Sequence, residues 1–170
     1  MKMLELHSTV VYGSSGIYRV TEIREEISRG KKNCFYVLQS VSDEKSFVYL
    51  PTDNPVLLGK VRQVLDRDAG CALIDSFPDL STEWIVDDRH RADHFRSILD
   101  SGDRLKIAEL ICTIYVHKQE LMAKGRRLRS SDDGYFQRAE RLLYDEFALA
   151  LGLERSAVVP FIAARLNPAS

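Results

Sequence analysis

Cysteine, proline and glycine are all scarce in this sequence of 170 residues. Its three cysteines, Cys34, Cys71 and Cys112, lie far apart and form no C-x-x-C pair, so the sequence indicates neither a disulfide framework nor a zinc site. Five prolines and nine glycines are too few for a disordered or collagen-like chain, and an apolar fraction of 45% is that of a globular protein. We therefore expect a folded protein with reduced thiols.

Long hydrophobic runs are also lacking. No stretch approaches the ~20 apolar residues that a membrane helix needs. The first residues, MKMLELHSTVVYGSSG, contain no long apolar run behind a basic segment. We therefore expect neither export nor membrane insertion, and a cytoplasmic location.

An excess of basic charge is absent as well. Twenty-four basic residues stand against twenty-five acidic ones, and a net charge of −1 excludes a protein that coats nucleic acid by bulk electrostatics. The cations are nevertheless grouped. One group comprises Arg89, His90, Arg91, His94 and Arg96, and a second comprises Lys118, Lys124, Arg126, Arg127 and Arg129. Such groups are either solvated helix surface, the commoner case, or local patches for a charged partner.

The first part of the chain has the pattern of a small β-sheet protein. β-Branched and aromatic residues dominate 9–12, 16–23, 34–41 and 46–50, and short polar, turn-forming runs separate these stretches. Short strands joined by tight turns predict a small antiparallel β-barrel over residues 1–58. A barrel of about 50 residues has only a marginal core of its own.

The second part, residues 59–170, has the period of helices. We expect helices over 66–77, over 87–99, from Asp103 to Gly125, after the cap residues 130–133, and over 154–166. The predicted fold is therefore α+β, with an N-terminal antiparallel barrel followed by a C-terminal all-α helical domain.

No constellation in the sequence supports an enzyme. His90 and His94 have the i, i+4 spacing of a metal-binding pair, but no motif identifies a third ligand. The loop from Gly13 to Gly16 leads into a strand, so it is interpreted as a hairpin turn. No G-x-S-x-G motif is present. We predict no catalytic residue, no metal, no cofactor and no small-molecule substrate.

The single tryptophan, Trp84, stands outside the apolar periodicity and is followed by Arg89, Arg91 and Arg96. A flat ring beside cations suits a protein that wedges at a base step while contacting phosphates. A tryptophan that packs on its own helix or core is an equally good interpretation of the composition.

An ordered series of motifs runs along most of the chain. It begins with V-V-Y-x-x-x-G from Val10 and Y-L-P from Tyr49, and continues with Trp84, Arg89-x-Arg91 and Ser101-Gly102-Asp103. It ends in the helix segment that starts at Asp132 and contains Tyr135-Phe136, Ala139-Glu140, Leu142-Leu143 and Glu146-Phe147. In this order the sequence resembles the CarD/CdnL family of bacterial transcription factors. Its N-terminal part also resembles the RNA polymerase interaction domain of the transcription-repair coupling factor.

The resemblance implies a Tudor-like barrel that binds the RNA polymerase β subunit and a helical domain that reaches promoter DNA. It implies a weak, non-specific contact in the minor groove at the upstream edge of the bubble, and no enzymatic activity. Such a protein would be associated with the nucleoid through the polymerase. The tryptophan of the family aligns with Trp84, and the phosphate-contacting residues are expected among a set of six cations. These are Arg89, Arg91, Arg96, Lys124, Arg126 and Arg127.

For the polymerase side, the stretch Ser46–Leu50 before Pro51 is the candidate edge strand, because an exposed edge can add to a partner's sheet. Some family members carry arginines at the positions that align with Glu26 and Tyr49, which implies a partner surface of different charge. The candidate polymerase-binding residues are Glu26, Phe47, Val48, Tyr49 and Pro51. A protein-only adaptor, whose barrel binds another protein or peptide, is the alternative that the neutral net charge favours.

Overall fold

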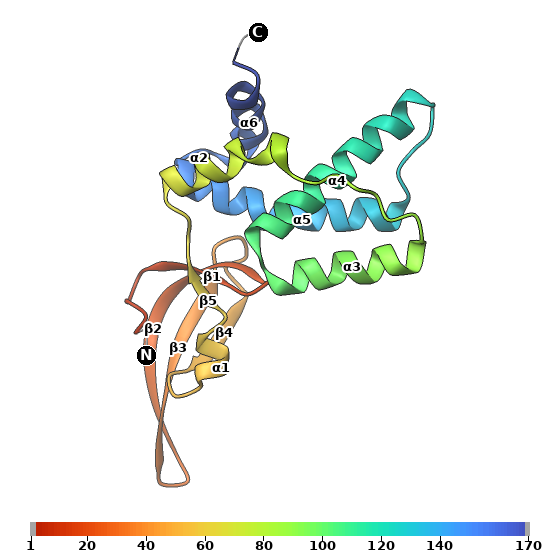
Figure 1. Ribbon diagram of the computed structural model, residues 1–170. Helices are drawn as coiled ribbons and strands as arrows, with labels where there is room; N and C mark the ends of the chain where they lie inside the picture. Colours follow the sequence, from red (N-terminus) through yellow and green to blue (C-terminus); the bar gives the residue numbers. More distant parts are fainter. Residues whose placement is uncertain (1–2, 169–170) are drawn as a thin grey trace. The chain divides into compact units, whose positions relative to one another are not determined.

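The computed structural model describes residues 3–168, and the chain divides after Val64 into two compact units (Figure 1). The sequence placed the boundary between residues 58 and 59. The structure places it later because a short strand at Val61–Gln63 still pairs with the N-terminal sheet.

The N-terminal unit is built on a five-stranded sheet in which every pair of neighbours is antiparallel. The strands are β1 (Thr9–Tyr12), β2 (Gly16–Ser28), β3 (Lys31–Ser40), β4 (Phe47–Pro51) and β5 (Val61–Gln63), and a short helix α1 (Pro55–Leu58) precedes β5. The strand order is β4-β3-β2-β1-β5, so β4 is an edge strand, as the sequence predicted. The antiparallel N-terminal sheet of the predicted α+β fold is confirmed.

Alternation of side chains along the strands creates the core of this unit. Its buried members lie on one face of the sheet, and they are Leu4, Val10, Tyr18, Val20, Tyr36, Leu38 and Leu50. A β-bulge between Val20 and Glu22 shifts the register of β2 against β3. Beyond the bulge Glu22 therefore lies on the face opposite the core, beside Val37.

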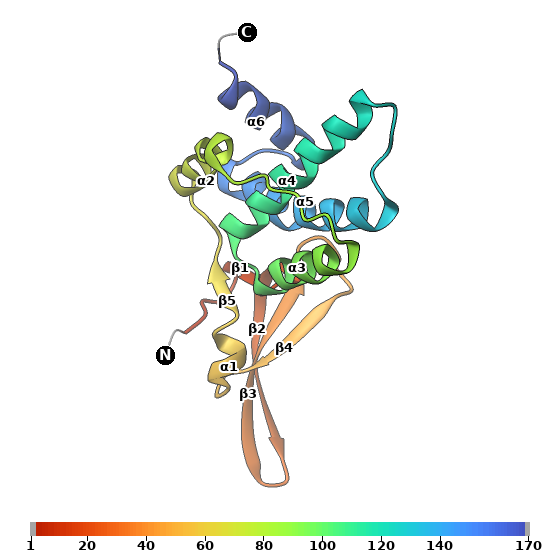
Figure 2. The same cartoon turned by 45° about the vertical axis from the view of Figure 1, so that its right-hand side comes forward.

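The β2–β3 hairpin is longer than the sequence predicted. The sequence predicted strands at 16–23 and 34–41 with a polar turn between them, but the strands continue to Ser28 and from Lys31, so that only Arg29 and Gly30 form the turn. Both turn residues have positive φ, 51° and 76°, which matches the twist of a two-residue hairpin. The hairpin extends past the end of β4 as two paired strands (Figure 2).

The second unit is helical, as predicted. Its elements are α2 (Arg67–Asp75), the 3-10 turn η1 (Phe77–Asp79), α3 (Asp88–Ser101), α4 (Arg104–Ala123), α5 (Ser130–Leu151), the 3-10 turn η2 (Arg155–Ala157) and α6 (Val158–Leu166). Aspartates cap three of the helices, because Asp66, Asp87 and Asp103 each accept a hydrogen bond from a backbone N–H three residues on. Gly152, with φ of 64°, ends α5 in the left-handed conformation.

The apolar faces of these helices share one core. Fully buried side chains from every α-helix of this unit contribute to it, among them Ile74, Leu99, Ile114, Phe147 and Val158. Among the described residues, no single helix is long and apolar enough to cross a membrane. Only α5 together with the η2–α6 segment has the required length and composition, and this pair is bent by 98°.

Candidate functional site

The first candidate site is the face of the sheet opposite the core, on strands β2, β3 and β4. In β4, Val48 and Leu50 pair with the core residues Leu38 and Tyr36, so Val48 lies on the core side. The alternate residues of β4 therefore lie on the opposite face. We call this face the outer face, and it carries Glu22, Arg24, Glu26, Phe35, Val37, Phe47, Tyr49 and Pro51. Four of the five predicted polymerase-binding residues, all except Val48, thus share one surface.

On the outer face the charged side chains lie on β2 and the aromatic side chains lie on β3 and β4. The side chains of Phe47 and Tyr49 are 44% and 54% exposed, although large aromatic residues are usually more buried than this. The Arg24 guanidinium carbon lies 5.8 Å from the Tyr49 ring centroid, and its Nη2 pairs with Glu22 Oε2 at 3.1 Å. The hydrogen bond from Arg24 holds the pKa of Glu22 below its usual value. Exposed aromatics beside an arginine are the composition of a protein-binding surface.

The free edge of β4 adds backbone groups to this surface. Ser40 N–H donates to Ser46 O at 2.9 Å and Thr52 N–H donates to Cys34 O at 3.0 Å, at the two ends of the β3–β4 ladder. Because hydrogen-bonded and non-hydrogen-bonded pairs alternate in an antiparallel ladder, the N–H groups of Phe47 and Tyr49 point away from β3. These two residues therefore present both exposed rings and edge amides.

The second candidate site surrounds Trp84 in the helical unit, in the segment that precedes α3. His117 of α4 stacks on the indole with ring centroids 3.6 Å apart and planes 6° apart. The Arg91 guanidinium carbon lies 4.6 Å from the indole centroid, and because the imidazole occupies one face, Arg91 covers the other. Phe95 packs edge-on at 6.1 Å. Trp84 is partly buried against the helical core, and what remains open is an edge of the ring.

Arg91, predicted to contact DNA phosphates, is instead a buried structural residue, 3% exposed. Its Nε and Nη2 bind Asp132 of α5 at 3.0 and 2.9 Å, and Asp132 is equally buried. Nη1 donates to the carbonyls of Ile85 and Val86, and Nη2 also binds Asp88. Burial opposes the charge of Arg91, but the hydrogen bonds from the two aspartates outweigh it and raise its pKa. Its donors are used within the protein, so the prediction of a phosphate contact is corrected.

Four other predicted cations are exposed at one end of the helical unit. Arg89 lies in the first turn of α3, and Lys124, Arg126 and Arg127 lie between the end of α4 and the start of α5. An ion pair from Arg129 to Asp88 ties the start of α5 to the start of α3. The two helices begin on the same side of the unit in Figures 1 and 2.

None of these four cations has an ion-pair partner among residues 3–168. Arg126 and Arg127 line a shallow depression of about 630 Å³ with Lys118 of α4. Arg96, a fifth predicted cation, differs from them, because it is exposed but paired with Asp93. We call the four residues Arg89, Lys124, Arg126 and Arg127 the basic end.

Comparison with known proteins gives a match to the N-terminal unit, which carries the outer face. Residues 4–64 match the family of CarD-like/TRCF RID domains. The N-terminal unit is therefore a CarD-like/TRCF RID domain. The resemblance found in the sequence is confirmed over these residues, and the helical unit lies outside the match. No curated protein matches the chain at a significant level.

The RID domain implies binding to RNA polymerase and a transcription-related function. The family is a protein-interaction domain and not a known enzyme family. His90 and His94, weighed as metal ligands, gain no third ligand, because no group of three or more His, Cys, Asp or Glu suited to a metal occurs among residues 3–168.

Sequence reasoning missed two residues of the helical site, His117 and Asp132. Asp132 was expected among the caps of α5, but the N-cap is Arg129 and Asp132 faces inward. A signal existed, because Asp132 precedes Phe136 by four residues and Ala139 by seven, which is the spacing of one face of a helix. No local pattern identified His117, which is 33 positions from Trp84 in the chain.

Proposed function

We propose that this protein is a transcription regulator in which the RID domain binds the β subunit of RNA polymerase. In this proposal the helical unit contacts promoter DNA at the upstream edge of the bubble, in the minor groove and without reading sequence. The contact changes the lifetime of the open complex. The protein is then held at the nucleoid, in the cytoplasm, through the polymerase.

The single observation that carries the polymerase contact is the edge strand of a RID domain that combines two outward-pointing amides with two exposed aromatic rings. Addition of a partner strand to such an edge supplies main-chain hydrogen bonds, and pockets for the alternate side chains supply specificity. Phe47 and Tyr49 provide both kinds of contact. Glu26, further along the outer face beside Asn33, offers a negative charge to a basic partner group.

Support for the DNA contact comes from the basic end and the open edge of Trp84. A net charge of −1 gives the free protein little affinity for DNA. Attachment to the polymerase raises the effective concentration to about millimolar, so that a few cations are enough for a useful contact. With both faces of its indole covered, Trp84 would present an edge to the groove and would not stack on a base.

Replacing Arg126 and Arg127 together by alanine should weaken the salt dependence of the effect on open-complex lifetime. If each cation neutralises one phosphate, the slope of log effect against log salt falls by about 2 units. The measurement is open-complex dissociation at several salt concentrations. Arg96→Ala is the matched control, since Arg96 is already paired with Asp93, and its slope should stay within about 0.5 of the parent value. An unchanged slope in the double variant would remove the basic end from the DNA contact.

Trp84→Phe should change the open-complex lifetime at least about threefold while polymerase affinity stays the same, because a difference of ~0.7 kcal/mol in contacts with open and closed DNA has this effect. Phenylalanine keeps an aromatic ring between Arg91 and His117 but shortens the exposed edge. His117→Gln is the control, because it removes the stacking partner and leaves the indole edge. If Trp84→Phe leaves the lifetime unaltered, Trp84 has only a structural role.

The structure also gives a reason to keep the protein-only adaptor as a second candidate. Arg91 is used internally and both faces of Trp84 are covered, so fewer groups remain for DNA than the sequence suggested. In that case the protein would bind polymerase with full affinity and leave the promoter footprint and the open-complex lifetime unaltered.

A further inference from the structure

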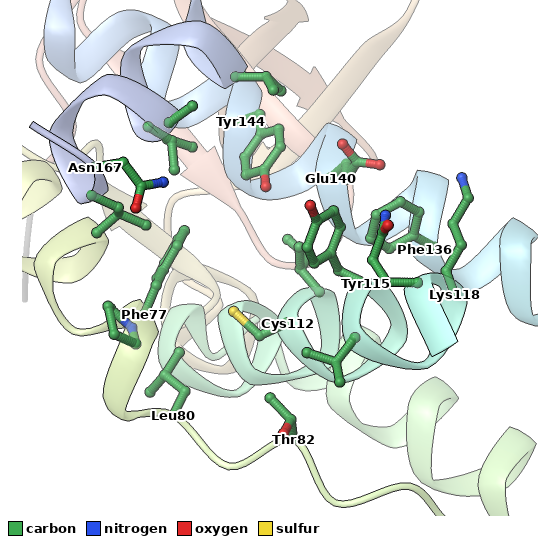
Figure 3. A pocket seen from close by; sticks show the side chains of 18 residues that line it. Phe77, Leu80, Thr82, Cys112, Tyr115, Lys118, Phe136, Glu140, Tyr144 and Asn167 are labelled. Atoms are coloured by element: carbon green, nitrogen blue, oxygen red, sulfur yellow. The ribbon is translucent and has the colours of Figure 1, made fainter. Parts of the chain in front are cut away.

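A cleft of about 710 Å³ opens in the helical unit between α4, α5, α6 and η1 (Figure 3). Its walls are mostly apolar and include Phe77, Leu80, Ile111, Phe136 and Ile162. The volume is within the range of sites that hold small organic molecules. Neither the RID domain nor the basic end uses this cleft.

Two polar groups of α5 face the cleft on successive turns. Tyr144 is 7% exposed, its hydroxyl is directed into the cleft, and this hydroxyl has no hydrogen-bond partner among residues 3–168 (Figure 3). No buried side-chain oxygen or nitrogen of the described residues lacks a hydrogen-bond partner, so this unpartnered hydroxyl is reached by solvent and is open to a ligand. Burial raises the pKa of the Tyr144 phenol, so it keeps its proton at neutral pH and can both donate and accept.

Glu140, one turn before Tyr144, adds a charge. Its carboxyl group is half-buried in the wall of the cleft and forms no ion pair within the described residues (Figure 3). Burial raises its pKa, and the nearby cations Arg155 and Lys118 offset only part of that effect. Arg155 is engaged with Asp145 at 2.9 Å, and the Lys118 ammonium lies 5.7 Å from the Phe136 ring centroid. Glu140 thus has two cations near it but forms an ion pair with neither of them.

Cys112 of α4 lines the cleft on the side opposite Tyr144 (Figure 3). Burial raises the pKa of its thiol to about 11, so it is neutral at physiological pH. An occupant of the cleft meets mostly apolar walls, with the Tyr144 hydroxyl and the Glu140 carboxylate on the α5 side (Figure 3). The other polar side chains of the lining are Thr82, Tyr115, Lys118, Gln119 and Asn167.

We propose that this cleft is a binding site for a small organic amine, with an aromatic or aliphatic body against Phe77, Ile111 and Ile162 and its ammonium group on Glu140 and Tyr144. The ammonium donates to the Glu140 carboxylate and to the Tyr144 oxygen, which satisfies the two groups that the protein leaves open. The site does not rest on the proposed polymerase and DNA contacts, so either can fail without the other.

The test compares three probes with one apolar body and different head groups: 4-phenylbutylamine, 4-phenylbutanol and 4-phenylbutyrate. Binding to the full chain is measured at pH 7 by titration of amide chemical shifts. We expect the amine to bind at least about tenfold more tightly than the carboxylate and about threefold more tightly than the alcohol, with shifts centred on residues of the cleft.

Variants identify the contacts. Glu140→Gln should reduce affinity for the amine about tenfold and leave the alcohol unchanged, and Tyr144→Phe should reduce both about threefold. Asp100→Asn, which removes an exposed carboxylate of α3 outside the cleft, is the control and should change neither. The proposal is overturned if the carboxylate or alcohol binds as tightly as the amine, if the shifts lie outside the cleft, or if no probe binds.

Discussion

Replacing Asp132 by alanine should lower the free energy of unfolding of the helical unit by about 3–5 kcal/mol, because it leaves a buried charge without its partner. Arg91 is 3% exposed and forms a bidentate ion pair with Asp132. Its remaining hydrogen bonds, to Asp88 and to two carbonyls, do not replace the lost carboxylate. The loss is large beside the 5–15 kcal/mol that typically stabilises a whole domain.

Urea unfolding followed by Trp84 fluorescence measures this loss directly, since Trp84 is the only tryptophan and contacts Arg91. Asp133→Ala is the matched control, because the Asp133 carboxylate accepts an exposed hydrogen bond from the Gln137 side chain of the same helix, and it should cost under about 1 kcal/mol. The double variant Arg91→Met/Asp132→Leu, which removes both charges, should be more stable than Asp132→Ala. A loss below about 1 kcal/mol for Asp132→Ala would contradict the structural role of the pair.

Replacing Phe47 and Tyr49 together by alanine should lower affinity for RNA polymerase at least about thirtyfold. Aromatic residues at the centre of an interface often contribute 1–2 kcal/mol or more each, and a loss of about 2 kcal/mol corresponds to this factor. Both side chains point away from the core of the RID domain, so the variant should fold as the parent does. Affinity is measured by interferometry with immobilised polymerase.

Two exposed apolar residues of the same domain serve as controls for the loss of hydrophobic surface. Val56 on α1 is 73% exposed and Ile27 near the tip of the β2–β3 hairpin is 81% exposed, and neither belongs to the outer face. Val56→Ala and Ile27→Ala should each change the affinity less than about twofold. If the Phe47/Tyr49 variant binds like the parent, the polymerase contact lies on another surface.

The fold was predictable where one local pattern decided the outcome. Each helix with an aspartate cap and a 3.6-residue apolar period was found, and so was the β4 edge, because β-branched and aromatic residues precede Pro51. Strand β5 was not found, since three residues give no period and its place depends on pairing with β1. The β2–β3 hairpin was predicted too short because its distal residues are polar, and polar residues suit a two-stranded extension as well as a loop.

The helical site was less predictable, because its parts come from distant positions in the chain. Arg91 precedes Phe95 by four residues and Ile98 by seven, so its place on the buried stripe of α3 was visible in the spacing. A buried arginine is nevertheless stable only with a partner, and Asp132 lies 41 positions away. The stacking of His117 on Trp84 is likewise a tertiary contact that composition cannot reveal.

Hydrogen exchange of the edge amides of β4 tests the polymerase contact most directly. Phe47 and Tyr49 N–H groups point away from β3, so in the free protein they should exchange much faster than those of Val48 and Leu50. With saturating RNA polymerase, strand addition at this edge should slow exchange at Phe47 and Tyr49 at least about a hundredfold, and leave β5 unchanged. Unaltered exchange at both amides in a fully formed complex would contradict the account.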